Sequence, residues 1–133
     1  MKKLLFGITL LVMTVNFSCK KDNDEAGEKP KTIEVEYKID RPNPYFVEIS
    51  YSNEANNMIT LRDITELSNG SKTISITKRP YTAKLTTILN NTSNQKINYN
   101  LIILVDGEIK KVSPVDAPPG VNGVTSTVQF TID

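Results

Sequence analysis

Histidine and tryptophan are absent from this 133-residue sequence, and cysteine occurs only once, at Cys19. Without histidine, the chain lacks the side chain that most often moves protons near pH 7 and most often binds transition metals. A single cysteine excludes an intramolecular disulfide and a zinc site built from several thiolates. These absences argue against an enzyme, and we expect no catalytic residue, no metal site and no cofactor.

The sequence also lacks a long apolar run and an excess of positive charge. Its longest apolar run, Leu4–Val15, is far shorter than the ~20 residues that cross a bilayer core. Lysine and arginine number 16 against 15 acidic residues, which gives a formal net charge of +1. Because no basic cluster accompanies this balance, we do not expect the protein to bind nucleic acid.

The amino-terminal segment is typical of a secretory signal peptide. Lys2 and Lys3 form a positively charged start, and Leu4–Val15 has the length of an apolar signal core. The alternative, a buried core helix, fits poorly, because the run begins directly behind two lysines and ends in a highly polar segment.

The segment Val15-Asn16-Phe17-Ser18-Cys19 resembles a bacterial lipobox, in which a small residue directly precedes a cysteine. The resemblance implies cleavage before Cys19 and acylation of Cys19, although Asn16 stands where the family prefers leucine. More than one acyl chain is needed for stable anchoring, and a lipoprotein cysteine carries that number. The alternative is an incidental cysteine within a signal peptide that is removed.

The segment Lys20–Glu25 resembles the lysine-then-acidic segments that follow the lipidated cysteine in Bacteroidetes lipoproteins, where they favour export to the cell surface. A plain solvated linker is the alternative. We therefore divide the chain into a signal peptide (residues 1–18), a lipidated cysteine with a flexible tether (19–31) and one folded domain (32–133). The expected location is the outer membrane, with the domain lipid-anchored and facing the periplasm or the cell surface.

After residue 31 the sequence alternates between apolar and polar residues in about eight short segments separated by turn signals. This pattern favours an all-β, Ig-like antiparallel β-sandwich of about 7–8 strands. A lone sheet fits less well, because Leu101–Val105 is continuously apolar, as in a strand covered on both faces or central in its sheet. The expected strands are 32–39, 45–52, 58–65, 72–78, 81–89, 96–105, 108–112 and 125–132.

Two dipeptides and one irregular stretch predict the connections. Asn69-Gly70 predicts a hairpin and Asp106-Gly107 a type I′ turn, since both favour positive φ. The phase of residues 58–65 slips near Arg62–Asp63, which suggests a bulge. Residues 108–112 read as an edge strand whose lysines oppose edge-to-edge association.

The order of Val47–Tyr51, Lys72–Lys78 and Tyr99–Val105 with the following Asp106-Gly107 resembles the domain of the mycobacterial small membrane proteins (MmpS-like). The resemblance spans about Glu34–Ile132, and the Pro-Trp that often precedes the middle strand in such proteins is absent. It implies an accessory domain that faces the periplasm or the cell surface.

Three residues are candidates for ligand contact: Phe46, Asp116 and Asn122. Phe46 is out of phase with Ile49 and should point away from the core; with nearby tyrosines it is a candidate aromatic platform for sugar or peptide. Asp116 and Asn122 lie in Ser113–Gly123, which three prolines predict to be either a recognition loop or a stiffened crossover.

Carboxylates give weaker signals. Asp63 and Glu66 have the spacing of a pair, but solvated surface explains them better than a catalytic role. Asp106, Asp116 and Asn122 offer oxygen ligands to Ca²⁺ without the spacing of a calcium loop. We therefore expect a lipid-anchored envelope module that binds an unknown protein or glycan, or alternatively a structural subunit that joins partners by β-strand addition.

Overall fold

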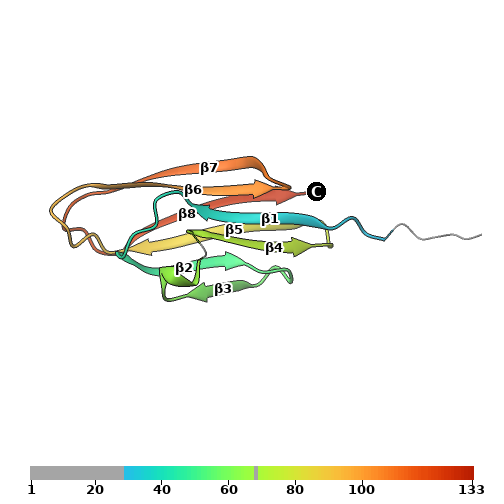
Figure 1. The fold of residues 1–133 in the computed structure, drawn as a ribbon, viewed down its shortest axis with the longest axis horizontal. Coiled ribbons are helices and arrows are strands. Elements are labelled where there is room, and N and C mark those ends of the chain that lie inside the picture. Colours follow the sequence, from blue (N-terminus) through green and yellow to red (C-terminus); the bar gives the residue numbers. More distant parts are fainter. Residues whose placement is uncertain (1–28, 68) are drawn as a thin grey trace, which may run out of the picture.

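The computed structural model describes residues 29–67 and 69–133 of the chain. These residues form two four-stranded antiparallel sheets stacked face to face, which confirms the expected all-β, Ig-like sandwich (Figure 1). Sheet A has the strand order β4-β1-β6-β7, and sheet B has the order β3-β2-β5-β8. The strands are β1 (Ile33–Ile39), β2 (Phe46–Ser52), β3 (Met58–Leu61), β4 (Ser71–Ile76), β5 (Tyr81–Leu89), β6 (Ile97–Val105), β7 (Glu108–Ala117) and β8 (Val124–Ile132).

The alternation of side chains builds the core between the two sheets. On β5 every second residue is buried over the whole strand, and the residues between them are half-buried on the outer face of sheet B. The same period on β1 buries its four odd-numbered residues from Ile33 to Ile39. Strand β5 has the bounds that the sequence predicts, because Pro80 and the polar residues after Leu89 end the pattern cleanly.

Strand β6 lies between β1 and β7, so its predicted central position is confirmed. Leu101, Ile103 and Val105 are buried against sheet B. Ile102 and Leu104 point to the outer face of sheet A and are half-buried. Cover on both faces is therefore not found within residues 29–67 and 69–133.

Asn69 and Gly70 both have positive φ, as the turn prediction requires. The predicted hairpin is nevertheless wrong, because β3 belongs to sheet B and β4 to sheet A. A Cβ on Gly70 would lie 2.6 Å from the Ile39 carbonyl oxygen, so glycine allows the chain to pass closely over the end of β1. The expected bulge at Arg62–Asp63 is also wrong, since β3 ends at Leu61 and a 3-10 turn (Ile64–Glu66) follows.

The described chain enters β1 and ends after β8 at the same end of the sandwich, which we call the terminal end (Figure 1). The opposite, distal end carries the connecting residues 40–45, 62–67 with 69–70, 90–96 and 118–123. Within the part of the chain that the structure describes, no helix has the length and apolar character needed to cross a membrane.

Candidate functional site

Cys19 and residues 1–28 lie outside the described residues, so the signal peptide, the lipidated cysteine and most of the tether remain predictions. The described part of the tether, from Lys29 to Lys31, contains no strand. The search for a functional site therefore concerns the sandwich.

The orientation predicted for Phe46 is wrong. Its side chain is buried in the core and packs edge-to-face on Tyr99, with ring centroids 5.0 Å apart. The pairing of β2 with β5 shifts register between Phe46 and Glu48, so Val47 is the extra residue and points to solvent. The bulge reverses which residues at the start of β2 face the core, so Phe46 is not part of a surface platform.

The expected aromatic platform is not formed, because its tyrosines serve the core. Tyr51 and Tyr81 are buried, and Tyr45 packs against the core as a half-buried residue. The hydroxyl oxygens of Tyr37 and Tyr81 lie 2.8 Å apart, and each lies 2.9 Å from the Ser52 carbonyl oxygen. Burial raises the pKa of Tyr37 and of Tyr81. The pair thus stays protonated and ties β1 in sheet A to β2 and β5 in sheet B.

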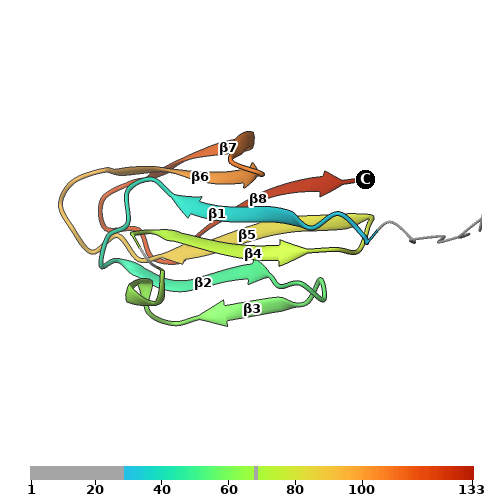
Figure 2. The ribbon, with the colours of Figure 1, turned by 45° about the vertical axis from the view of Figure 1, so that its right-hand side comes forward.

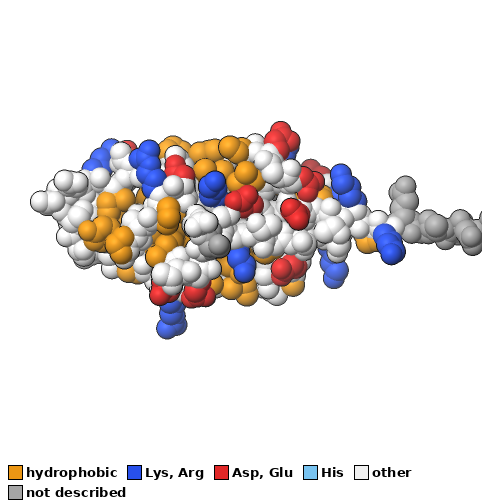
Figure 3. All heavy atoms as spheres, viewed as in Figure 1, with side chains coloured by type: hydrophobic (Ala, Val, Ile, Leu, Met, Phe, Trp, Pro, Cys, Tyr) orange, Lys and Arg blue, Asp and Glu red, His pale blue; other side chains and the backbone are white. Residues whose placement is uncertain are grey.

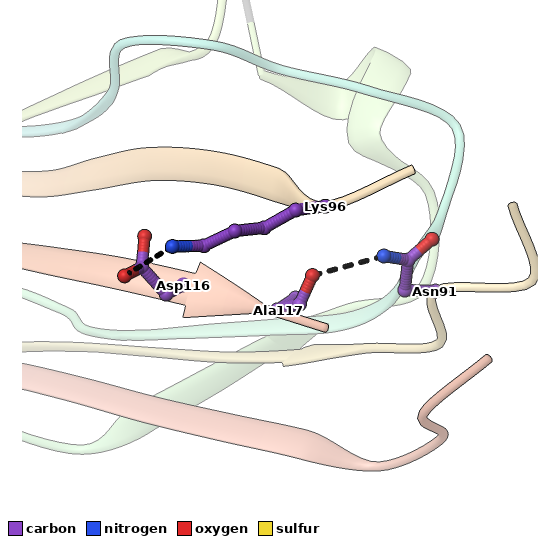
Figure 4. A network of polar contacts seen from close by, with 4 residues as sticks. All are labelled: Asn91, Lys96, Asp116 and Ala117. Carbon is purple, nitrogen blue, oxygen red and sulfur yellow. Dashed lines mark hydrogen bonds and ion pairs between the residues drawn. The ribbon is translucent and has the colours of Figure 1, made fainter. Parts of the chain in front are cut away.

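Asn91 fixes the distal loops from a fully buried position. Its side-chain nitrogen lies 2.9 Å from the Ala117 carbonyl oxygen (Figure 4). The same nitrogen lies 2.8 Å from the Gln95 carbonyl oxygen and 3.0 Å from that of Pro118. Its backbone nitrogen donates to the Val121 carbonyl oxygen at 2.8 Å. One buried amide therefore joins the β5–β6 loop to the end of β7 and to the loop before β8.

Half of the predicted irregular loop is strand. Residues 113–117, including Asp116, continue β7, and only the residues from Pro118 to Gly123 form a loop. The Asp116 carboxylate lies 2.8 Å from the Lys96 ammonium, and both side chains are more than half exposed (Figure 4). Asn122 lies in the exposed loop between β7 and β8. No pocket is found in the described part of the chain, so these two candidates do not line one.

The other candidate carboxylates have local structural partners. Asp63 caps the 3-10 turn by accepting a hydrogen bond from the Thr65 backbone nitrogen at 2.9 Å, and this bond lowers the pKa of Asp63. Asp106 accepts a hydrogen bond from the Glu34 backbone nitrogen, also at 2.9 Å. In the two described ranges, no three acidic, histidine or cysteine residues gather as metal ligands.

Strand β7, one edge of sheet A, carries several features that oppose further pairing. Ile103 pairs with Lys111 and Leu104 with Ile109, so Lys110 forms a bulge on β7. Pro114 pairs with Asn100 within the strand and has no N–H to offer a neighbour. Lysines, a bulge and a proline are the devices by which natural sheets protect their edges.

Strand β8, the edge of sheet B on the same side of the sandwich, has none of these features. Its nine residues include no charged residue and no proline, and they pair with β5 from Val124 to Ile132 without a register shift. Its free side has no partner strand among the described residues. The outward-facing side chains are exposed and neutral: Thr125, Thr127, Gln129 and Thr131.

The position of β8 limits what can pair with it. Strand β8 packs across the sandwich from β6 and β7, and Figures 1 and 2 both show β7 reaching beyond β8 on that side. A strand added to β8 would therefore lie beneath the inner face of β7. The other two edges are shorter, since β3 has four residues and β4 has six, among them Lys72.

The free β8 edge is thus the strongest candidate site in the described chain. The sequence alone does not distinguish this strand as a site; its signal is an alternation of polar and apolar residues over 127–132 and the lack of lysine, glutamate and proline over 125–132. Comparison with protein-family models finds no match for the chain, and comparison with curated proteins finds none either.

Proposed function

We propose that this protein is an exported, lipid-anchored subunit of the cell envelope that joins another polypeptide by β-strand addition at β8. In this proposal the protein is not an enzyme. The observation that carries it is the contrast between β8, which is long, regular and uncharged, and the protected edge β7 on the same side.

An open edge strand presents a row of backbone N–H and C=O groups that another strand can pair with. Main-chain hydrogen bonds supply the affinity in this mode, so no pocket is required. Threonine and glutamine on the outer face of β8 favour a partner strand with neutral polar residues on the same face, because cross-strand pairs of such residues form hydrogen bonds. Thr86 and Thr127 already make such a pair within the sheet, with their hydroxyl oxygens 3.0 Å apart.

The overhang of β7 favours a single extended segment as the added strand. A whole sheet edge would bring its own second layer against β7, which reaches beyond β8 (Figure 2), whereas a single strand brings no second layer. The inner face of β7 is already buried at Val115 and Ala117 near the distal end. Toward the terminal end this face continues with Ser113 and Lys111, which pair with the buried Leu101 and Ile103, so a partner segment would lie beside polar side chains there.

The anchor is supported by sequence alone. The lipobox-like segment ending at Cys19 and the lysine-acidic segment Lys20–Glu25 favour a Bacteroidetes-type lipoprotein at the outer membrane, facing the periplasm or the cell surface. The MmpS-like order of strands agrees with an accessory role. A tether of about a dozen residues lets the sandwich stand clear of the lipid surface and reach a partner.

The distal loops favour a second candidate function, a module that binds a protein or glycan through loop residues such as Asn122. Asn91 holds these loops in one conformation, which lowers the entropic cost of recognition. No pocket accompanies them in the described chain, so this candidate ranks below strand addition.

The test uses the full chain in cells, with a photo-reactive residue at Gln129 on β8. We expect one discrete cross-linked partner, which is lost when Thr127→Lys places a charge on the open edge. The matched control is Thr73→Lys, the same change at an exposed position of the β4 edge, and it should leave the cross-link intact. An adduct that resists Thr127→Lys, or no adduct at Gln129, would overturn the proposal.

The anchor has its own readout. Intact mass of the membrane-extracted protein should match residues 19–133 plus acyl chains, and Cys19→Ser should remove the lipid mass and release the protein from the membrane fraction. Unchanged fractionation of this variant would refute the anchor and leave the β8 test standing.

A further inference from the structure

The outer face of sheet A carries a compact group of four apolar side chains, which we call the apolar block: Ile102 and Leu104 on β6, and Ile109 and Val112 on β7. Ile102 pairs with Val112 and Leu104 with Ile109, so the block forms two adjacent rows. Ile109 is 59% exposed and Val112 is 43% exposed. Figure 3 shows hydrophobic side chains gathered over β6 and β7 on this face.

Isolated exposed apolar residues are ordinary on protein surfaces, but this group is contiguous and spans the central strand β6 and the edge strand β7. The continuous run Leu101–Val105 is the pattern of a strand that is covered on both faces or central in its sheet, and β6 is central in sheet A. Sheet B covers the inner face, and nothing within residues 29–67 and 69–133 covers the outer one. A partner outside the described fold that covered this face would remove the exposed apolar surface from water.

The charges beside the block are of both signs and lie in register with its rows. On β1, Lys38 pairs with Ile102, and Glu36 pairs with Leu104. One row across the sheet is therefore Lys38, Ile102 and Val112, and the next is Glu36, Leu104 and Ile109.

We propose that the apolar block is covered by a second copy of this chain, packed face to face about a two-fold axis. An axis that lies in the interface and crosses the strands between the two rows places each row on the other row of the second copy. Lys38 then faces Glu36 of the second copy, and this contact occurs twice. Ile102 packs on Leu104, and Val112 on Ile109, in the manner of stacked sheets.

The mixed charges select this occupant over a lipid surface. An anionic membrane would attract Lys38 and repel Glu36, so the two rows would work against each other. A two-fold symmetric contact uses both charges, because each meets its opposite. The interface also lies on the outer face of sheet A, so a dimer leaves both β8 edges in sheet B free.

The test is sedimentation of the full chain, purified in mild detergent, over a range of concentrations. We expect a monomer–dimer equilibrium that Lys38→Glu or Glu36→Lys alone weakens by roughly tenfold or more, because like charges then meet across the axis. The double variant with both changes restores opposite charges and should recover the association. A purely structural role for these residues would give no such recovery.

Val112→Lys should also weaken the dimer, since it places a charge in the centre of the apolar block. Thr127→Lys on β8 is the control and should leave the dimer intact. A monomer at all concentrations, or a double variant that does not recover, would overturn the inference. A dimer lost through Thr127→Lys but kept in Lys38→Glu would overturn it as well and would assign self-association to β8.

Discussion

Strands β7 and β8 follow each other in the chain and form the edges of the two sheets on one side of the sandwich, yet they are built from opposite kinds of residue. Strand β7 contains Lys110 in a bulge, Lys111 and Pro114. Strand β8 consists of threonine, serine, glutamine and apolar residues and contains no charge. A few lysines, a proline or a bulge are enough to protect an edge strand. Because β7 has these features and β8 lacks them, we infer that the β8 edge serves to pair with a partner.

The largest expected effect comes from giving β7 the character of β8. Deleting Lys110 removes the bulge, Lys111→Thr removes one charge beside it, and Pro114→Thr restores a backbone N–H. We expect this variant to form higher-order species beyond the association of the unchanged chain, because a second open edge becomes available for pairing. Light scattering against concentration measures this.

The control for that experiment combines the same three changes with Thr127→Lys. If association depends on pairing between open edges, the added charge on β8 should reduce it. If the three changes on β7 produce no new species, these residues do not protect the β7 edge. The difference between β7 and β8 then no longer supports a role for β8.

The next effect concerns the junction between the two strands. Asn91→Ala should destabilise the sandwich by about 3 kcal/mol, because it leaves buried carbonyl oxygens of the Ala117 region without a donor. Chemical denaturation measures the change. Asn94→Ala, at an exposed position of the same loop, is the matched control and should change stability by less than about 0.5 kcal/mol.

Hydrogen exchange adds a sharper readout to the same variant. Amides near Ala117 at the end of β7 and near Val124 at the start of β8 should lose protection first, because Asn91 joins the loop between them to the β5–β6 loop. Equal loss throughout the sandwich would contradict a local role for Asn91.

The strands and core residues of this fold can be predicted from the sequence where the local pattern is clear. The prediction fails where strand pairing inserts an extra residue. The sequence predicts residues 81–89 with the bounds that β5 has, because Pro80 precedes them and polar residues follow Leu89. The sequence places Phe46 on the wrong face, because the bulge at Val47 is set by the register with β5 and not by the local pattern. It predicts a loop at Pro114, although an edge strand tolerates proline.

The candidate site was less accessible to sequence reasoning than the fold. Which strand lies at an edge depends on strand order, and Asn69-Gly70 predicted a hairpin between strands that belong to different sheets. The residue types of an open edge can be recognised in a sequence. That residues 124–132 form such an edge follows only from the strand order. Asn91 gave no signal at all, because a single buried amide leaves no period in the sequence.

A smaller effect concerns strand β5, which pairs with β8 on the side opposite its open edge. Burial raises the pKa of Tyr81 on β5 and of Tyr37 above the unfolded value of about 10. Their contribution is therefore complete below pH 10 and declines as pH rises further, since the unfolded chain then releases protons that the folded chain retains. Each tyrosine should add a slope of up to about 1.4 kcal/mol per pH unit.

Denaturation between pH 9 and pH 11 measures this slope, and Tyr81→Phe should reduce it while costing about 1 kcal/mol near neutral pH through the lost hydrogen bond to Ser52. An unchanged slope in this variant would mean that alkaline destabilisation arises elsewhere, for example from lysine.

The smallest effect belongs to the distal end of β7. The ion pair between Lys96 and Asp116 is 2.8 Å long but exposed, so Asp116→Ala should change stability by less than about 0.5 kcal/mol, and a double-variant cycle with Lys96→Ala measures the pair itself. The same variant also separates the two candidate functions. If partners pair with β8, the cross-link at Gln129 should survive Asp116→Ala, whereas loss of that cross-link without loss of stability would move recognition to the distal loops.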